Sequence, residues 1–448
     1  MSKRLTNKRA LGRPRTKTVV FVCQPFPAHL YPHAPLMKAF EAQGWTAVLA
    51  TPDKLALTAE QYRLTHVTAG IEWAVGKVAD SVARRLLTDG NDAFCAEAFG
   101  HLANATKTMY PDLLRIVQEL DADLIVTEPS ALAGYLVGEK LGVPVIASDN
   151  GLVRLVHDLW RPVMVPRLNE ARAMFGLRPE PKGSVPGHFN TLIVPTVQEL
   201  LLGDLDLPGF VGFQHQNPVS KGWRLPDGVF TNPKVTKIYA MFGSTGSSIP
   251  AWRDIFDNSN RIAIAAAAAL GDKVELFISV GKGNVGKYAD LRGLTEDEAG
   301  PYAYRARGTG NVWVTARTAQ PLALELADIA LLHGGYGGLR EDLTAGTPAV
   351  WAPNQTDQPD NAKRMSRNNL GVYLPNPRFA TVDDMTRAIR EVIARKDEIS
   401  GNLHALNGRI AMLPTVEQLV RGIDLCLELG DDTFRALKRP AAGAAGGR

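Results

Sequence analysis

The chain has 448 residues, which is too long for one compact core and predicts about two domains. With 45% hydrophobic and 21% charged residues, its composition is typical of a soluble globular protein. The formal net charge of +4 comes from residues 1–17, which hold seven Lys or Arg and no acid; without those seven charges the remainder carries −3, which excludes a nucleic-acid groove. We expect residues 1–17 to be a disordered basic tail, the alternative being a segment that docks on an acidic surface.

The cysteines and the apolar runs indicate the compartment. Cys23, Cys95 and Cys426 are odd in number and include no CxxC pair, so the sequence predicts neither a disulfide framework nor a zinc knuckle. No secretory leader is visible, and the longest apolar run, at residues 262–270, is far too short to cross a bilayer. We therefore expect a cytoplasmic protein without stable membrane insertion.

The first part of the chain is predicted to form an α/β unit. A β-branched run at residues 19–22 is followed by a proline-rich turn and then by apolar residues at helical spacing as far as Phe40. Two further apolar runs, at residues 122–128 and 143–149, have the length of buried strands and flank a helix-length segment.

The second half repeats this pattern of strand, turn and helix. A strand from Val235 ends in a Gly/Ser turn, and four more apolar runs follow, most of them separated by helix-length segments. These runs end at Gly281, start at Asn311, end at Gly335 and end at Pro353. Because each run is apolar on both faces, the pattern predicts a parallel sheet that is covered by helices.

The domain boundary is predicted from composition. Residues 215–234 are rich in Pro, Gly and Asn and lack periodicity, as expected of a linker. The fold class is therefore α/β, with two Rossmann-like domains whose parallel sheets face each other across a cleft. The predicted parts are an N-terminal domain at 18–214, the linker at 215–234, a C-terminal domain at 235–414, a C-terminal helix at 415–437 and a disordered low-complexity tail at 438–448.

The segment LLHGGYGGLREDLTAGTP, at residues 331–348, carries the first chemical signal. His333 ends a predicted strand at the carboxyl edge of the sheet, where open α/β folds bind ligands. Gly335, Gly337 and Gly338 let a bulky anion approach the backbone, and a helix is expected to start near Gly338. The unpaired N–H groups of its first turn favour a phosphate, to which His333 adds a hydrogen bond or a charge. The alternative is a tight turn with a packed histidine.

The residues around the next predicted strand favour a sugar and a ribose as the rest of the ligand. Asp357, Gln358 and Asn361 follow that strand at the same edge of the sheet. A carboxylate beside carboxamides both accepts and donates hydrogen bonds, which suits a ligand rich in hydroxyl groups. Glu341, one turn into the glycine-started helix, is placed to accept from a ribose diol. Phosphate, ribose and polyhydroxyl groups together describe a nucleotide sugar.

These residues match the donor signature of the family 1 nucleotide-sugar glycosyltransferases, which the chain resembles between residues 18 and 430. The group includes plant, macrolide and glycopeptide enzymes and has the GT-B fold. The matching residues are His333-Gly334-Gly335, Gly337, Glu341, Gly346, Pro348, Pro353, Asp357-Gln358 and Asn361-Ala362. Residues 21–40 resemble the first strand and loop of the family, and residues 209–213 resemble the end of its N-terminal domain. The resemblance implies that the N-terminal domain binds the acceptor and the C-terminal domain the nucleotide sugar.

The resemblance also implies an inverting transfer. An acceptor hydroxyl is deprotonated and attacks the anomeric carbon while the nucleoside diphosphate leaves from the opposite face. His29 matches the catalytic base of the family. Where the family has an aspartate that orients this base, the chain has Glu128, which either pairs with His29 or is an ordinary strand-end residue. His33 forms an HxxxH pair with His29, but no third ligand stands at a suitable spacing; we expect no metal, and no cofactor besides the nucleotide-sugar co-substrate.

The donor signature departs from the family at three places. Where many members have a tryptophan that stacks on uracil, this chain has Arg317, with Gln320 retained; a guanidinium also stacks, which leaves UDP and TDP donors open. Gly338 replaces a threonine or serine, so one hydroxyl contact to phosphate is lost. Ser244 and Thr245 follow the first strand of the C-terminal domain and either contribute to the diphosphate site or form a plain polar turn.

The acceptor site is expected within residues 60–110 and 150–200 of the N-terminal domain. Large apolar residues there either line a pocket for an apolar natural product, such as a polyketide or macrolide, or pack in the core. The candidates are Tyr62, Trp73, Phe94, Phe99, Trp160, Met164 and Phe175.

Other functions compatible with the sequence are an epimerase or hydrolase of nucleotide sugars with the same fold, and a degenerate family member that binds a nucleotide sugar without catalysis or helps a partner enzyme. The GKGNVG motif at residues 281–286 satisfies GxGxxG, but the polar, broken segment after it indicates a chance match rather than a dinucleotide site. A homodimer is one option for assembly.

Overall fold

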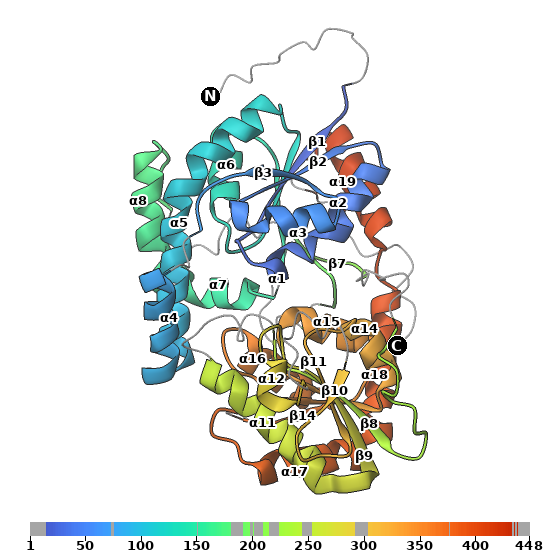
Figure 1. The fold of residues 1–448 in the computed structure, drawn as a ribbon. Helices are drawn as coiled ribbons and strands as arrows, with labels where there is room; N and C mark the ends of the chain where they lie inside the picture. The colour runs from blue at the N-terminus through green and yellow to red at the C-terminus, as the bar shows by residue number, and fades with distance from the viewer. Residues whose placement is uncertain are drawn as a thin grey trace.

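The chain folds into two α/β domains in the computed structural model, with the N-terminal domain drawn above the C-terminal domain in Figure 1. The structure describes residues 15–72, 76–149, 151–180, 191–197, 200, 209–214, 224–243, 253–291, 303–375, 377–431, 434 and 437. Within these ranges, no helix has the length and hydropathy needed to cross a membrane.

The N-terminal domain is built on a parallel seven-stranded sheet of order β3-β2-β1-β4-β5-β6-β7. Its strands are β1 (Thr18–Val22), β2 (Thr46–Thr51), β3 (Thr65–Thr68), β4 (Leu124–Thr127), β5 (Val145–Ser148), β6 (Leu192–Val194) and β7 (Phe210–Gly212). Its helices include α1 (Pro27–Leu30), α2 (His33–Ala42), α3 (Ala56–Gln61), α4 (Gly76–Thr88), α5 (Asn91–Glu119), α6 (Ala133–Leu141), α7 (Val153–Leu159) and α8 (Val165–Met174).

The C-terminal domain has a second seven-stranded sheet, of order β10-β11-β9-β8-β12-β13-β14. Its strands are β8 (Thr236–Met241), β9 (Val274–Ser279), β10 (Ala303–Arg305), β11 (Val312–Thr315), β12 (Ile329–Leu332), β13 (Ala349–Trp351) and β14 (Val372–Tyr373). The helices that follow include α11 (Arg253–Leu270), α12 (Val285–Tyr288), α14 (Gln320–Leu326), α15 (Tyr336–Ala345), α16 (Gln358–Arg367), α17 (Val382–Ala394), α18 (Lys396–Ala411) and α19 (Val416–Glu428).

Each buried apolar run of the sequence forms a strand, but the sheets contain strands that the sequence analysis does not identify. β3 has the polar sequence THVT and is only half buried, and β14 has two residues, so neither has the pattern of a buried strand. The prediction of parallel sheets is confirmed, with one antiparallel pair at an edge, where β10 pairs with β11. An antiparallel pair needs only a short connection, and residues 306–311 are enough here.

Helices cover both faces of the N-terminal sheet. One face packs against α5 and α6, and the other packs against α2. The second face also receives α19, whose buried side chains Leu419 and Ile423 share a cluster with Phe40 of α2. A capping box between Thr415 and Gln418 starts this helix. The last described helix of the chain therefore returns from the C-terminal domain to the N-terminal one (Figure 1).

The first described residues are tied to this returning helix. Nζ of Lys17 is 2.5 Å from a carboxylate oxygen of Asp424 and 3.0 Å from one of Glu428, both on α19. Arg15 donates to the carboxylate of Asp123 at 2.9 Å. Residues 15 and 17, which the sequence assigns to the basic tail, thus contact the folded domain.

Loops at the carboxyl ends of the strands meet between the two domains. Gly151, which follows β5 and has a φ of +98°, lies against Tyr336 at the start of α15: a Cβ at Gly151 would be 2.4 Å from the Cβ of Tyr336. A side chain other than hydrogen at position 151 would separate the two domains here. The ring of Tyr336 is buried and belongs to the core cluster of the N-terminal domain.

Candidate active site

A histidine–glutamate pair lies at the carboxyl edge of the N-terminal sheet. His29 lies on α1, the short helix after β1, and Glu128 directly follows β4. Nδ1 of His29 is 2.8 Å from Oε2 of Glu128. The glutamate side chain is fully buried, whereas the histidine side chain is 18% exposed, so the pair has a protected end and an end that reaches solvent.

Two further groups hold the Glu128 carboxylate in place. Its Oε1 accepts from the backbone N–H of Gln24 at 3.0 Å and from the hydroxyl of Ser130 at 2.7 Å. Burial alone would raise the pKa of the Glu128 carboxyl, but the charge of His29 and the hydrogen bonds from His29 and Ser130 outweigh it and lower that pKa. Because an ionised carboxylate only accepts, Nδ1 of His29 carries the proton that it donates to Glu128, and in the neutral form of the ring Nε2 has the lone pair that a base needs.

The sequence analysis identifies the pair but not the residues that anchor it. Gln24 follows β1 by two residues, and Ser130 follows β4 by three. Both therefore lie at the carboxyl edge, the same signal that points to Glu128. The extra methylene of glutamate relative to the family aspartate does not prevent contact with His29.

His33 is buried rather than placed at the surface of the site. Its ring is 0% exposed, and its centroid is 5.7 Å from that of Phe21. Burial lowers the pKa of His33 to about 4, so the ring is neutral near pH 7. His29 and His33 also lie on two successive helices, α1 and α2, so their HxxxH spacing does not place them on one helix face. In the part of the chain that the structure describes, no group of three or more His, Cys, Asp or Glu side chains is arranged to hold a metal ion.

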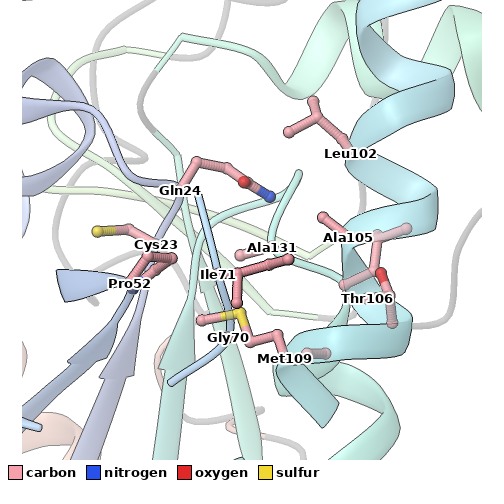
Figure 2. Close-up of a pocket in the computed structure, with 12 residues that line it drawn as sticks. Cys23, Gln24, Pro52, Gly70, Ile71, Leu102, Ala105, Thr106, Met109 and Ala131 are labelled. Atoms are coloured by element: carbon pink, nitrogen blue, oxygen red, sulfur yellow. The ribbon is translucent and has the colours of Figure 1, made fainter. Parts of the chain in front are cut away.

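A pocket adjoins the histidine–glutamate pair through Gln24, whose side-chain amide also donates to the backbone carbonyl of Ser130 at 3.0 Å. Figure 2 shows residues from α5 along one side of this pocket, opposite Cys23 and Gln24. The lining residues are Cys23, Gln24, Pro52, Gly70, Ile71, Leu102, Ala105, Thr106, Met109, Ala131, Leu132 and Ala133. Most of these side chains are apolar and small or aliphatic.

The large residues proposed from the sequence for an acceptor pocket do not line this one. The core residues among them, each at most 4% exposed, are Phe94, Phe99, Trp160 and Met164. Phe175 stacks on Tyr110 with ring centroids 3.8 Å apart, and Trp73 lies outside the described residues. Residues 60–110 contribute Gly70 and Ile71 to the pocket, together with four residues of α5, namely Leu102, Ala105, Thr106 and Met109.

The glycine turn lies at the carboxyl edge of the C-terminal sheet. β12 ends at Leu332, and α15 begins at Tyr336, two residues earlier than the sequence predicts, so Gly337 and Gly338 lie in its first turn. The first N–H groups of a helix have no partner within the helix and give its N-terminal end a partial positive charge. The helix ends as expected at Gly346, which has a φ of +71°.

The glycines of this turn serve different purposes. A Cβ at Gly335 would lie 2.4 Å from Nε2 of His333, and a Cβ at Gly243 would lie 3.1 Å from the same atom, so the histidine ring occupies the space beside both glycines. Gly334 has a φ of +77°, which favours glycine. A Cβ at Gly337 would meet nothing within 4 Å, so the missing side chain leaves open space beside the helix N-terminus. The turn therefore packs a histidine and also leaves room for a ligand.

The chemistry of His333 is that of a neutral ring. Burial lowers the pKa of His333 to about 4, so near pH 7 it offers a hydrogen bond and no charge. A Cβ at Gly338 would lie 3.2 Å from Nε2 of Gln320. The Gln320 amide thus lies close to where the threonine or serine side chain of the family would begin. Ser244 and Thr245 lie outside the described residues.

The residues proposed for the nucleoside lie on three neighbouring segments. Arg317 is exposed between β11 and α14, Gln320 is the first residue of α14, and Glu341 lies on α15. Burial raises the pKa of the Glu341 carboxyl to about 7, against the opposing effect of the Arg340 charge. The Glu341 carboxyl therefore titrates much closer to neutral pH than an ordinary glutamate does.

Two tyrosines of the N-terminal domain approach this nucleoside region. Tyr31 follows α1, two residues after His29, and its ring centroid is 5.6 Å from that of Tyr62. Burial raises the pKa of Tyr31, and the charges of Arg317 and Glu341 act on it from the C-terminal domain. The sequence analysis does not identify Tyr31, because its proximity to Arg317 depends on how the two domains meet.

The residues proposed for the donor sugar form one hydrogen-bonded unit with the glycine turn. Nδ2 of Asn361 donates to Oδ2 of Asp357 at 2.7 Å and to the carbonyl of Gly334 at 3.0 Å. Oε1 of Gln358 accepts from the backbone N–H groups of residues 354 and 355, at 2.9 and 3.1 Å. Burial raises the pKa of Asp357 to about 7, against the hydrogen bond from Asn361. Gln358 thus fixes the segment that carries Asp357.

Two Rossmann-like domains with functional residues at the carboxyl edges of both sheets define the GT-B class of glycosyltransferases. The comparisons with solved structures confirm this fold. Spinosyn rhamnosyltransferase SpnG superimposes with a TM-score of 0.70 and 19% sequence identity over 91% of this chain and 100% of that chain. Its structure has also been solved in complex with thymidine diphosphate, and this form has a TM-score of 0.69.

The sequence comparisons confirm the resemblance to family 1 nucleotide-sugar glycosyltransferases. The family model described as UDP-glucoronosyl and UDP-glucosyl transferase matches residues 327–406, which include the glycine turn and the loop that carries Asp357 and Gln358. NDP-glycosyltransferase YjiC of Bacillus subtilis (strain 168) is 24% identical over 385 residues, which are 83% of this chain and 88% of that protein. 4'-Demethylrebeccamycin synthase of Lentzea aerocolonigenes is 25% identical over 329 residues, 66% of this chain and 71% of that protein. These relatives support glycosyl transfer from a nucleotide sugar as the general reaction.

Proposed function

We propose that this protein is an inverting, metal-independent glycosyltransferase that moves a hexose or deoxyhexose from a UDP- or TDP-sugar to a hydroxyl group of an apolar small molecule. The single observation that carries the proposal is the 2.8 Å contact between Nδ1 of His29 and the buried Glu128 carboxylate, beside an apolar pocket. A histidine whose other nitrogen is held by an anchored carboxylate is the arrangement that a general base requires.

On the acceptor side, the pair removes one proton. An acceptor hydroxyl bound beside His29 donates to Nε2 of that residue, and its oxygen attacks the anomeric carbon of the donor. As the new C–O bond forms, the proton moves to Nε2 and the ring becomes an imidazolium. The ionised Glu128 carboxylate stabilises this cation, and its bonds to Gln24 and Ser130 keep it from turning away.

On the donor side, negative charge grows on the diphosphate as the bond to the sugar breaks. The N-terminal end of α15 and the open space at Gly337 suit this group, and His333 adds a neutral hydrogen bond. Because the helix terminus supplies partial positive charge, the proposal requires no cation. A transfer rate that EDTA leaves unchanged is therefore expected.

The donor base is recognised by Arg317, Gln320 and Glu341, which lie on three neighbouring segments. The guanidinium of Arg317 takes the stacking role of the family tryptophan. SpnG has been solved with thymidine diphosphate, which favours testing TDP-sugars beside UDP-sugars. Most side chains that line the pocket beside Gln24 are apolar, which supports an apolar acceptor.

The test is a thermal-shift and calorimetric screen against UDP-glucose, TDP-glucose and TDP-deoxysugars, with NAD as the control. A donor at about one hundred times its dissociation constant should stabilise the fold by roughly 2.7 kcal/mol. The preferred donor is then incubated with a panel of polyketide and macrolide aglycones, and the anomeric configuration of the product is determined. Donor cleavage without any glycosylated product would indicate a hydrolase, and no binding of any nucleotide sugar would refute the proposal.

A further inference from the structure

A contact between the domains holds the segment that carries the donor-sugar residues. Asn91 is the first residue of α5 in the N-terminal domain, and Thr356 follows β13 in the C-terminal domain. Nδ2 of Asn91 donates to the carbonyl of Thr356 at 3.0 Å, and the backbone N–H of Thr356 donates to Oδ1 of Asn91 at 2.7 Å. One side-chain amide thus binds both backbone groups of a single residue.

Thr356 is a position where such support matters. Its φ is +59°, in the left-handed region that β-branched residues rarely adopt. It directly precedes Asp357 and Gln358, so its backbone sets the direction in which these two residues leave the loop. A backbone in a disfavoured conformation persists only where its surroundings hold it, and Asn91 is the group that does so from the opposite domain.

The rest of the loop is held from within the C-terminal domain. The Gln358 side chain accepts from the N–H groups of residues 354 and 355, and Asn361 holds the Asp357 carboxylate. These bonds do not depend on how the domains are arranged. The bonds of Thr356 to Asn91 exist only when the N-terminal end of α5 lies against the loop.

We propose that Asn91 is a positioning residue that couples recognition of the donor sugar to closure of the two domains. When the domains approach, Asn91 fixes the left-handed backbone of Thr356 and thereby aligns Asp357 and Gln358 with the sugar. This inference rests on the proposed function, since it assumes that these two residues bind the sugar of a nucleotide donor. Under this inference, binding of the sugar by Asp357 and Gln358 of the C-terminal domain also requires Asn91 of the N-terminal domain.

A second contact between the domains provides a matched control. Nη1 of Arg378 donates to the carbonyl of Leu87 at 3.0 Å, near the end of α4. Arg378 is exposed, and its hydrogen bond to Leu87 does not involve the loop of Thr356. Removing the Arg378 side chain therefore weakens the association of the domains without acting on the loop that carries Asp357 and Gln358.

The experiment compares binding of a nucleoside diphosphate with binding of the corresponding nucleotide sugar. Calorimetry on the full chain gives the dissociation constants of UDP and UDP-glucose, or of TDP and TDP-glucose if the wild type prefers thymidine. For Asn91→Ala we expect unchanged affinity for the diphosphate and about tenfold weaker binding of the nucleotide sugar, the effect of losing two hydrogen bonds. For Arg378→Ala we expect the same ratio of the two constants as in the wild type.

Equal weakening of both ligands by Asn91→Ala would overturn the proposal, because it would show a general role in the fold. Unchanged affinity for both ligands would overturn it as well, as would the same selective loss in Arg378→Ala. A wild type that binds neither nucleotide refutes the proposed function instead, so the two failures are distinguishable.

A double variant tests the mechanism of the coupling. Glycine adopts a positive φ without steric penalty, so Thr356→Gly removes the need to hold the backbone at that position. We expect Asn91→Ala/Thr356→Gly to recover part of the affinity for the nucleotide sugar that Asn91→Ala loses. A double variant that binds the nucleotide sugar no better than the single variant would show that Asn91 does not act through the backbone of Thr356.

Discussion

The acceptor side and the donor side of the site hold their ionisable groups in opposite ways. On the acceptor side, Glu128 accepts three hydrogen bonds and its pKa is lowered, which favours the ionised carboxylate. On the donor side, burial raises the pKa of Glu341 and Asp357 to about 7 and lowers that of His333 to about 4. The acceptor side is thus organised to stabilise a cation that forms on His29. The donor side has a neutral histidine and two carboxyls that titrate near pH 7. This low charge suits the hydroxyl groups of a sugar and a diphosphate that carries its own negative charge.

The largest test of this comparison removes the base. His29→Ala is expected to lower kcat for glycosyl transfer by about 10²–10⁴-fold, the range for loss of a positioned general base. Donor affinity measured by calorimetry should stay unchanged, because His29 belongs to the acceptor side. His101→Ala, a change at a partly exposed helical histidine, is the control. Transfer by His29→Ala at the wild-type rate would disprove the role of His29.

The next largest effect is expected from the charge of Glu128. Glu128→Gln keeps the size of the side chain but leaves no anion to stabilise the imidazolium, so kcat should fall by about a hundredfold or more. Glu128→Asp restores the family residue and the charge on a shorter side chain, and should lose less activity. If the amide variant were as active as the wild type while the aspartate variant were not, the contribution of Glu128 would be its length rather than its charge.

On the donor side, two glycine substitutions in the same turn separate the packing of His333 from the binding of the diphosphate. Gly335→Ala places a Cβ against the His333 ring, so it should destabilise the protein without ligand by about 1–3 kcal/mol, as measured by denaturant unfolding. Gly337→Ala has open space and should not destabilise the protein, and it should weaken donor binding if the diphosphate approaches there. Destabilisation of equal size by both changes would contradict the different purposes assigned to the two glycines.

The sequence predicts the elements and residues that have a local pattern, and it misses those that depend on their neighbours. Buried runs such as VVFV in β1 determine their strands, because their residues are apolar on both faces. The polar β3 and the two-residue β14 are held by their neighbours, which local pattern does not show. His29, Glu128 and the glycine turn follow from motif position at the carboxyl edges of strands.

The hydrogen-bond partners of the site residues could not be predicted from the sequence. Gln24 meets Glu128 across 104 residues of sequence, and Asn91 meets Thr356 across 265. Contacts of this kind depend on strand order and on how the domains meet, and the local patterns of a single sequence show neither. The aromatic candidates Phe94, Phe99 and Trp160 are buried in the core and do not line the pocket, which their spacing along the chain does not show.

The smallest expected effect concerns the pH dependence of donor binding. The pKa of the Glu341 carboxyl in the folded protein is about 7, above its ordinary value of 4.5, so the group is mostly protonated at pH 6 and mostly ionised at pH 8. A ribose diol donates two hydrogen bonds, which an ionised carboxylate accepts best; binding therefore favours the ionised form and releases protons. Affinity for a nucleotide sugar should rise as pH increases through 7, by up to about tenfold between pH 6 and 8. A nucleotide sugar is the right probe, because its diphosphate has no terminal phosphate that titrates in this range.

Calorimetry in two buffers of different ionisation enthalpy measures the released protons directly. Glu341→Gln cannot ionise, so it should bind donor with a weaker dependence on pH, leaving only the contribution of Asp357, whose pKa is also about 7. Asp357→Asn is the matched variant for that remaining part. If Glu341→Gln kept the full proton release of the wild type, Glu341 would not be the group that meets the ribose, and the near-neutral donor side would have to be assigned to Asp357 alone. If neither variant changed the proton release, neither carboxyl would change its protonation state on donor binding, and the contrast between the two sides of the site would not hold.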